Sequence, residues 1–245
     1  MNDEMKRNQH VSSISAFFPC YNDELSISKM VDDVRTALTE VVDDFEIIVV
    51  NDGSRDGSAR VLDDLQSRVP ELRVVTHEVN RGYGGALISG FAHSTKQWVF
   101  YTDGDAQYDA TELARCTTAV TEFVDVVQGY KIGRGDPLHR RVIGRVYHHA
   151  VKFLFRLSVR DTDCDFRLIR RSVMRDIVLQ STSGVICVEL MHSLKKVGAR
   201  FTEVGVSHHH RPHGRSQFFR LPAIARSSSQ LVGLWFRLIV RKSSS

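Results

Sequence analysis

The first half of the chain alternates between short apolar runs and segments whose apolar residues recur at helical spacing. The apolar runs have the length of buried strands, and they lie at 14–18, 45–50, 72–76 and 98–102. Helices are predicted between them at about 27–41, 58–68 and 84–94. Because parallel strands need crossover connections, this order predicts an α/β fold with a mostly parallel sheet and helices on both faces.

The second half is less regular. Strands are predicted at 124–130 and 201–206, and helices around 142–157 and 185–197. A last helix is predicted from Pro222, where apolar residues alternate with arginines and serines interrupt the pattern at 227–229. That mixture is typical of a helix that lies on a membrane rather than crossing it. Packing against the protein or against a second subunit is the alternative.

This pattern predicts a domain plan with one globular unit. We expect a loose N-terminus at 1–12, a catalytic domain at 13–219, an amphipathic helix at 220–241 and a loose tail at 242–245. The N-terminus has no apolar signal region, and no run of about 18 apolar residues occurs, so we expect neither secretion nor a transmembrane helix. Four scattered cysteines are expected to be reduced thiols in a cytoplasmic protein.

Charge is distributed unevenly along the chain. The formal net charge is +4, but no Asp or Glu follows Glu203, whereas seven Lys and Arg residues do. Such asymmetry favours a phosphate-rich or membrane-surface partner, with a solvated basic tail as the alternative. The basic residues lack the interleaved aromatic platform of a single-strand binder, so a nucleic-acid partner is not expected.

Candidate chemistry gathers where the predicted strands end. The run at 98–102 is followed by Asp103, Asp105 and Gln107, which are oxygen donors suited to Mg²⁺ or Mn²⁺. Polar segments at 19–24 and 51–54 follow two other strands. Ligands of open parallel sheets bind outside the carboxyl ends of the strands, so these segments predict one shared site.

Five segments in this order resemble the family 2 glycosyltransferases of the GT-A fold. They read FPCYNDE at 18–24, VVNDGSRDG at 49–57, NRGYGGA at 80–86, DGDAQ at 103–107 and RDTDCDFR at 160–167. The branch that they are most similar to is the polyprenyl-phosphate glycosyltransferases, which include dolichol-phosphate mannose synthase. The resemblance extends over about 13–219 and implies a nucleotide-sugar donor.

The resemblance implies specific donor and metal contacts. Asp105 and Gln107 would bind Mn²⁺ or Mg²⁺, and Arg211 would hold the donor diphosphate. The other donor contacts that it implies are Pro19, Tyr21, Asp23, Val50, Asp52, Gly82, Asp103 and Gly104. Asp56 is instead expected to be a turn or helix-cap residue.

The acceptor side is expected in the second half. By resemblance, Lys131, Arg140, Arg141 and Arg145 would bind the acceptor phosphate. Asp165 and Glu189 are candidates for a general base if the acceptor is a hydroxyl, and otherwise for salt bridges with Arg167 or Arg170. The histidines at 208–210 are expected to make hydrogen bonds or phosphate contacts, with a metal role for one of them as the alternative.

The function predicted from the sequence is metal-dependent, inverting transfer of a sugar from GDP-mannose or a UDP-sugar to a polyprenyl phosphate. The protein would act as a peripheral protein on the cytoplasmic face of a membrane, and a homo-oligomer or a membrane-protein partner is left open. Three alternatives remain: a related transferase with a hydroxyl acceptor, a non-catalytic nucleotide- or nucleic-acid-binding module, and a membrane-recruitment protein with a degenerate catalytic domain.

Overall fold

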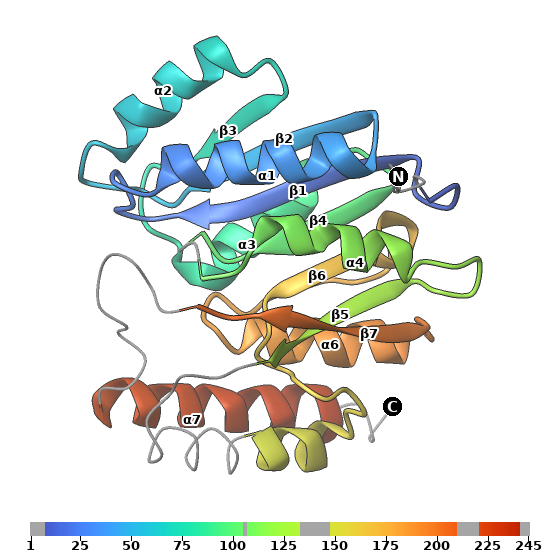
Figure 1. Cartoon of the computed structure of the whole chain (residues 1–245). Helices are drawn as coiled ribbons and strands as arrows, with labels where there is room; N and C mark the ends of the chain where they lie inside the picture. Colours follow the sequence, from blue (N-terminus) through green and yellow to red (C-terminus); the bar gives the residue numbers. More distant parts are fainter. Residues whose placement is uncertain (1–7, 105–106, 133–147, 210–220, 241–245) are drawn as a thin grey trace.

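The centre of the protein is a seven-stranded sheet in the order β3-β2-β1-β4-β6-β5-β7 (Figure 1). The computed structural model describes residues 8–104, 107–132, 148–209 and 221–240, and the side chains of 221–226 are not described. The strands are β1 (Ser13–Cys20), β2 (Asp44–Asn51), β3 (Leu72–Thr76), β4 (Trp98–Thr102), β5 (Val126–Ile132), β6 (Phe166–Arg170) and β7 (Phe201–Ser207). Strands β1 to β4 pair in parallel, β6 is antiparallel to β4 and β5, and β5 pairs in parallel with β7.

Helices cover both faces of the sheet (Figure 1). They are α1 (Ile27–Val41), α2 (Ser58–Arg68), α3 (Gly82–His93), α4 (Leu113–Thr118), α6 (Ile186–Lys196) and α7 (Leu221–Trp235), with a further helix at 148–155 and a π-helical turn at Phe236–Val240. One apolar cluster joins α1, α2 and α4 to the sheet, and a second joins α3, α6, α7 and the helix at 148–155 to it. Alternation along β1 separates the two, because Ile14 and Phe18 belong to the first cluster and Phe17 to the second.

The structure confirms the predicted α/β class, and α2 and β3 have the predicted bounds. It adds β6, which was not predicted because its five residues FRLIR carry two arginines and follow a polar motif. The serines at 227–229 do not end the last helix, since α7 runs from Leu221 to Trp235. Part of the segment predicted to be loose is also fixed, because the Asn8 side chain donates to the carbonyls of Thr117 and Val120.

The register of the strands brings the polar segments to one edge of the sheet. Cys20 pairs with Asn51, and Asn51 pairs with Thr76, so β1, β2 and β3 end together. In the antiparallel pair, Thr102 at the end of β4 lies opposite Phe166 at the start of β6. The residues that flank this pair, Asp103 and Asp165, therefore emerge at the same edge.

Two further findings concern the helices as possible membrane spans and the state of the cysteines. None of the helices in the described part of the chain combines the length and the apolar character that a membrane span requires. All four cysteines are buried and free.

Candidate functional site

Asp52 ties the ends of β2 and β3 to the start of α3. Its Oδ1 accepts a hydrogen bond from the Arg81 amide at 2.8 Å and lies 2.7 Å from His77 Nδ1. The other ring nitrogen of His77 lies 2.8 Å from Ser89 Oγ on α3. Asp52 and His77 are both buried, so this network fixes the loop that follows β3. A contact between Asp52 and a base or ribose stays a prediction.

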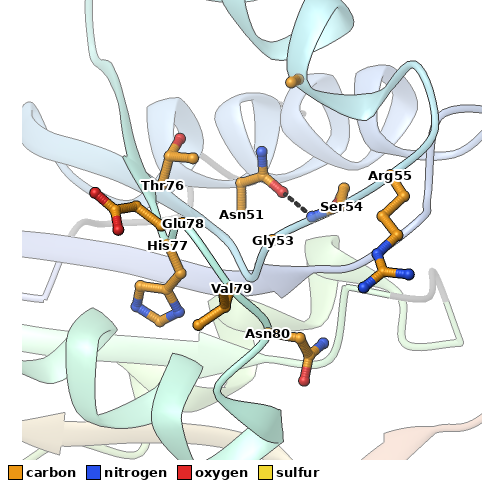
Figure 2. Close-up of a pocket in the computed structure, with 10 residues that line it drawn as sticks. Asn51, Gly53, Ser54, Arg55, Thr76, His77, Glu78, Val79 and Asn80 are labelled. Carbon is orange, nitrogen blue, oxygen red and sulfur yellow. Dashed lines mark hydrogen bonds between the residues drawn. The ribbon is translucent and has the colours of Figure 1, made fainter.

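A pocket of about 350 Å³ lies outside the ends of β2 and β3 (Figure 2). It is lined by Asn51, Gly53, Ser54, Arg55, Ala59, Thr76, His77, Glu78, Val79 and Asn80. Gly53 has φ +68°, and a Cβ there would lie 2.6 Å from the Asn80 amide nitrogen, so only glycine fits this turn. The residues at 77–79 were not predicted to belong to the site, although they directly follow the predicted strand at 72–76.

Asp56 organises the turn before α2, as predicted. Its carboxylate accepts hydrogen bonds from the Ser58 amide and hydroxyl and from the Glu24 amide. Burial alone would raise the pKa of Asp56, but these hydrogen bonds lower it below its usual value. The Asp23 amide donates to Ser58 Oγ, so the loop after β1 is held in the same network, and the Tyr21 side chain beside it is exposed.

The glycines at the start of α3 make room for the protein's own backbone. Gly84 donates its amide to the Thr182 carbonyl at 3.0 Å. A Cβ on Gly82 would lie 2.4 Å from Thr182 O, and one on Gly84 would lie 2.1 Å from Ser181 O. The close approach expected of these glycines is thus made by the loop before α6. A phosphate contact at Gly82 stays a prediction.

Tyr83 fixes the first aspartate of the Asp103–Gln107 segment. Its hydroxyl donates to Asp103 Oδ1 at 2.7 Å. Burial and the negative charges of Asp103 and Asp165 raise the pKa of Tyr83 well above its usual value, so its hydroxyl remains a proton donor. Gly104 is confined as well, because a Cβ there would lie 2.0 Å from the Pro19 carbonyl oxygen at the end of β1.

Asp165 is a nearly buried carboxylate at the same end of the sheet as Tyr83 and Asp103. Its Oδ1 lies 3.1 Å from Arg167 Nη1, 3.1 Å from Cys187 Sγ and 3.3 Å from the Tyr101 hydroxyl. Burial raises the pKa of Asp165 from 3.8 to about 6, against the opposing effect of its hydrogen bonds. The expected salt bridge with Arg167 is therefore present.

Gln107 meets the segment that follows β7. Its Nε2 donates to the His209 carbonyl at 3.0 Å, and the His209 amide donates to the Gln107 carbonyl at 2.8 Å. Tyr108 and His208 pair beside them, with ring centroids 5.1 Å apart. A metal contact of Gln107, which would use its Oε1, stays a prediction. Within the described residues, no cluster of three His, Cys, Asp or Glu side chains forms a metal site.

Lys131 is the one predicted acceptor-phosphate residue that the structure describes. Its Nζ donates to the Asp163 carbonyl at 2.8 Å and lies 5.9 Å from the Tyr108 ring centroid. Burial favours a lower pKa for Lys131, but the negative charges of Asp161, Asp165 and other neighbours outweigh it and raise the pKa. Lys131 therefore keeps a positive charge next to Asp161 and Asp165.

The salt bridge of Glu189 is formed with Arg237, whereas Arg167 or Arg170 was the expected partner. Glu189 is buried on α6, where its carboxylate pairs with Arg237 at 2.7 Å. The same carboxylate accepts hydrogen bonds from the amides of Gln180 and Ser181. Arg170 instead pairs with Asp125.

Several predicted site residues lie outside the described residues. They are Asp105, Arg140, Arg141, Arg145, Arg211 and His210. Their proposed roles remain predictions from the resemblance.

With this geometry in place, comparison with known proteins decides the family. The model of the family described as "Glycosyl transferase family 2" matches residues 15–178. The chain belongs to glycosyl transferase family 2. The match begins in β1 and ends beyond β6, so it includes the carboxyl-edge residues described above from Pro19 to Asp165.

Curated relatives of this family 2 chain are similar over most of its length. An undecaprenyl-phosphate 4-deoxy-4-formamido-L-arabinose transferase of Pseudomonas aeruginosa is 30% identical over 232 residues, which are 94% of this chain and 65% of the relative. A protein of the same name from Edwardsiella ictaluri is 30% identical over 210 residues, or 85% of this chain and 63% of that protein. The chain thus spans less than two thirds of the length of these relatives.

Solved structures confirm the predicted GT-A fold. Glucosyl-3-phosphoglycerate synthase from Mycobacterium tuberculosis in complex with phosphoglyceric acid has a TM-score of 0.68 and 19% identity, covering 92% of this chain and 79% of that one. The same synthase with Mn²⁺, UDP and phosphoglyceric acid also has a TM-score of 0.68 at 19% identity, covering 92% and 78%. At this identity the likeness concerns the fold.

We predict that Asp165 makes the stability of this family 2 domain depend on pH. Because its pKa is raised from 3.8 to about 6, the folded state favours the protonated carboxyl, and this stabilisation is lost as the pH rises through 6. Between pH 4 and pH 7, wild type should lose about 2 kcal/mol of unfolding free energy relative to Asp165→Asn. Urea unfolding at several pH values measures this difference, and a constant difference would contradict the prediction.

Proposed function

We propose that this family 2 chain transfers a sugar from a nucleoside-diphosphate donor to a polyprenyl phosphate. The observation that carries the proposal is the convergence at one sheet edge of Asp103, held by Tyr83, and Gln107, held by His209. Relatives named as undecaprenyl-phosphate sugar transferases support a polyprenyl phosphate as the acceptor. The same edge of the sheet carries the pocket at the ends of β2 and β3.

The donor would lie across this edge with its nucleoside toward the pocket. Mn²⁺ or Mg²⁺ is supported by the structural neighbours solved with either cation and UDP. Asp105 and Gln107 would hold the cation, which when bound supplies charge neutralisation for the departing nucleoside diphosphate. Arg211 would bind the same diphosphate. Asp103, fixed by Tyr83, is suited to accept hydrogen bonds from donor hydroxyls.

A phosphate acceptor fits the carboxylates better than a hydroxyl acceptor. A hydroxyl needs a general base, and both candidates are engaged, Glu189 by Arg237 and Asp165 by Arg167. A lipid phosphate is already an anion at neutral pH and can attack the anomeric carbon directly, opposite the leaving diphosphate, with inversion. Lys131, Arg140, Arg141 and Arg145 would bind that phosphate, since arginine forks match its geometry.

Membrane attachment is proposed through one surface of the second half. Leu231 and Leu234 of α7 are buried in the domain, whereas Val232 and Phe236 are each 52% exposed on the other side of the same helical segment. Phe153 on the helix at 148–155 is 84% exposed, and both helices contribute buried residues to one apolar cluster. Exposed apolar side chains near arginines are typical of a peripheral membrane surface.

The proposed transfer is tested with purified protein, Mn²⁺, UDP- and GDP-sugars and undecaprenyl phosphate. We expect glycolipid from one of the donors. Asp105→Ala should abolish Mn²⁺-dependent donor binding, and Gln107→Ala should weaken it about tenfold, as expected for a loss of about 1.4 kcal/mol. Titration calorimetry with Mn²⁺ and the nucleotide measures both.

Asp64→Ala is the matched control for these variants, because this carboxylate is exposed on α2 and pairs with the neighbouring surface residue Arg68. It should leave donor binding unchanged. Retained Mn²⁺-dependent binding by Asp105→Ala would overturn the metal assignment. Transfer to a soluble alcohol but not to lipid phosphate would instead favour the hydroxyl-acceptor alternative.

The membrane surface gives a separate prediction. The double variant Val232→Ser/Phe236→Ser should co-sediment several-fold less with anionic phospholipid vesicles than wild type, because exposed apolar area is lost without a change in the core. Phe123→Ser is the control, since this residue is 65% exposed but lies between α4 and β5, outside α7 and the helix at 148–155. Equal loss of vesicle binding in both variants would contradict the assignment.

A further inference from the structure

The end of the α7 segment reaches into the domain through one arginine. Arg237, in the π-helical turn after α7, donates from Nη1 to Gln180 Oε1 at 2.7 Å. Its Nη2 donates to Ser181 Oγ at 3.1 Å and to Glu189 Oε1 at 2.7 Å. One guanidinium therefore joins the C-terminal helical segment to α6 and to the loop that precedes it.

Glu189 holds the same loop from the other side. Its Oε1 and Oε2 lie 3.3 Å and 3.2 Å from the Gln180 amide nitrogen, and Oε2 accepts from the Ser181 amide at 2.8 Å. The residue is only 2% exposed. We call Glu189, Arg237, Gln180 and Ser181 the clamp. A buried carboxylate with these partners is satisfied as an acceptor and has an ionic partner, which a stable buried charge requires.

The loop held by the clamp packs directly on the start of α3. The Thr182 carbonyl accepts the Gly84 amide, and an added Cβ on Gly84 would lie 2.1 Å from Ser181 O. Backbone contacts this close leave no space for the loop to move toward α3, and movement away breaks the hydrogen bond. Between the two glycines at 82 and 84 stands Tyr83, which donates to Asp103.

We propose that Glu189 and Arg237 are positioning residues for the donor site, which act through the loop at 180–182, the start of α3 and Tyr83. This inference rests on the proposed function and assigns Glu189 a role other than general base. It also means that the C-terminal helical segment, through Arg237, helps to position the donor site. Position matters because a displaced binding group loses affinity and rate without any change in the groups that touch the donor.

The variants Glu189→Gln, Arg237→Gln and the double variant test the clamp. Each single variant leaves one buried polar group mispaired, whereas two glutamines can hydrogen-bond to each other. We expect each single variant to weaken Mn²⁺–nucleotide binding and raise the donor KM about five- to tenfold, with a smaller fall in kcat, and the double variant to lose less than the sum. Arg237→Lys should restore part of the loss, since it keeps the charge facing Glu189.

A general base would behave differently. Glu189→Gln would then lower kcat by about 10²- to 10⁴-fold with donor binding unchanged, and Arg237→Gln would not share its effect. That result would overturn the clamp. Arg68→Gln is the matched control, because Arg68 pairs with Asp64 on the exposed side of α2 and should leave every donor parameter unchanged.

Amide hydrogen exchange tests the effect of the clamp on the start of α3 in the absence of substrate. In Arg237→Gln, the amides at 82–85 should exchange at least several-fold faster than in wild type, because the Gly84–Thr182 hydrogen bond loosens. Unchanged exchange together with unchanged nucleotide binding overturns the inference. A wild-type protein that binds nucleotide but forms no glycolipid overturns the proposed acceptor instead, while exchange and binding still decide the clamp.

Discussion

The sheet is held together at β6, between the parallel strands β1 to β4 and the pair β5 and β7, and this junction depends on one buried arginine. Arg167 on β6 is fully buried, and its guanidinium donates to Gln128 on β5, to the Thr162 carbonyl and to Asp165. Burying a charge without partners costs several kcal/mol, so all three acceptors must stay in place for the fold to be stable. This requirement fixes the start of β6, and through the antiparallel register it places Asp165 beside Asp103.

The same constraint sets the charge balance of the site. Asp103, Asp161 and Asp165 all lie close enough to Lys131 to raise its pKa, and their negative charges together would be unfavourable without positive charge nearby. Lys131 supplies part of it from β5, and its pKa is raised by these neighbours. Tyr83 stays protonated and donates to Asp103, so the carboxylate is oriented before any donor arrives.

The sequence was sufficient to predict elements and residue roles where local patterns determine structure. The apolar periodicity predicted α2 and β3 to the residue. The turn role of Asp56 was predictable because Ser58, which donates two of its hydrogen bonds, lies two positions away. The sequence was insufficient where partners are remote. Strand β6 was missed because Arg167 breaks the apolar pattern, and its burial is made acceptable by Gln128, Thr162 and Asp165. The contact of Glu189 with Arg237 joins residues 48 positions apart, and no local signal predicts it.

The engagement of the carboxylates also bears on what the acceptor must be. A base must have a lone pair that faces the nucleophile, yet Glu189 directs both oxygens to Arg237 and to the amides of the loop before α6. Asp165 faces Arg167, Cys187 and Tyr101. Freeing Asp165 would remove the ionic partner of the buried Arg167, and freeing Glu189 would remove that of the partly exposed Arg237. Base catalysis would therefore be opposed by the stability of the fold. An acceptor that arrives already ionised would avoid this conflict, which supports the proposed phosphate acceptor over a hydroxyl.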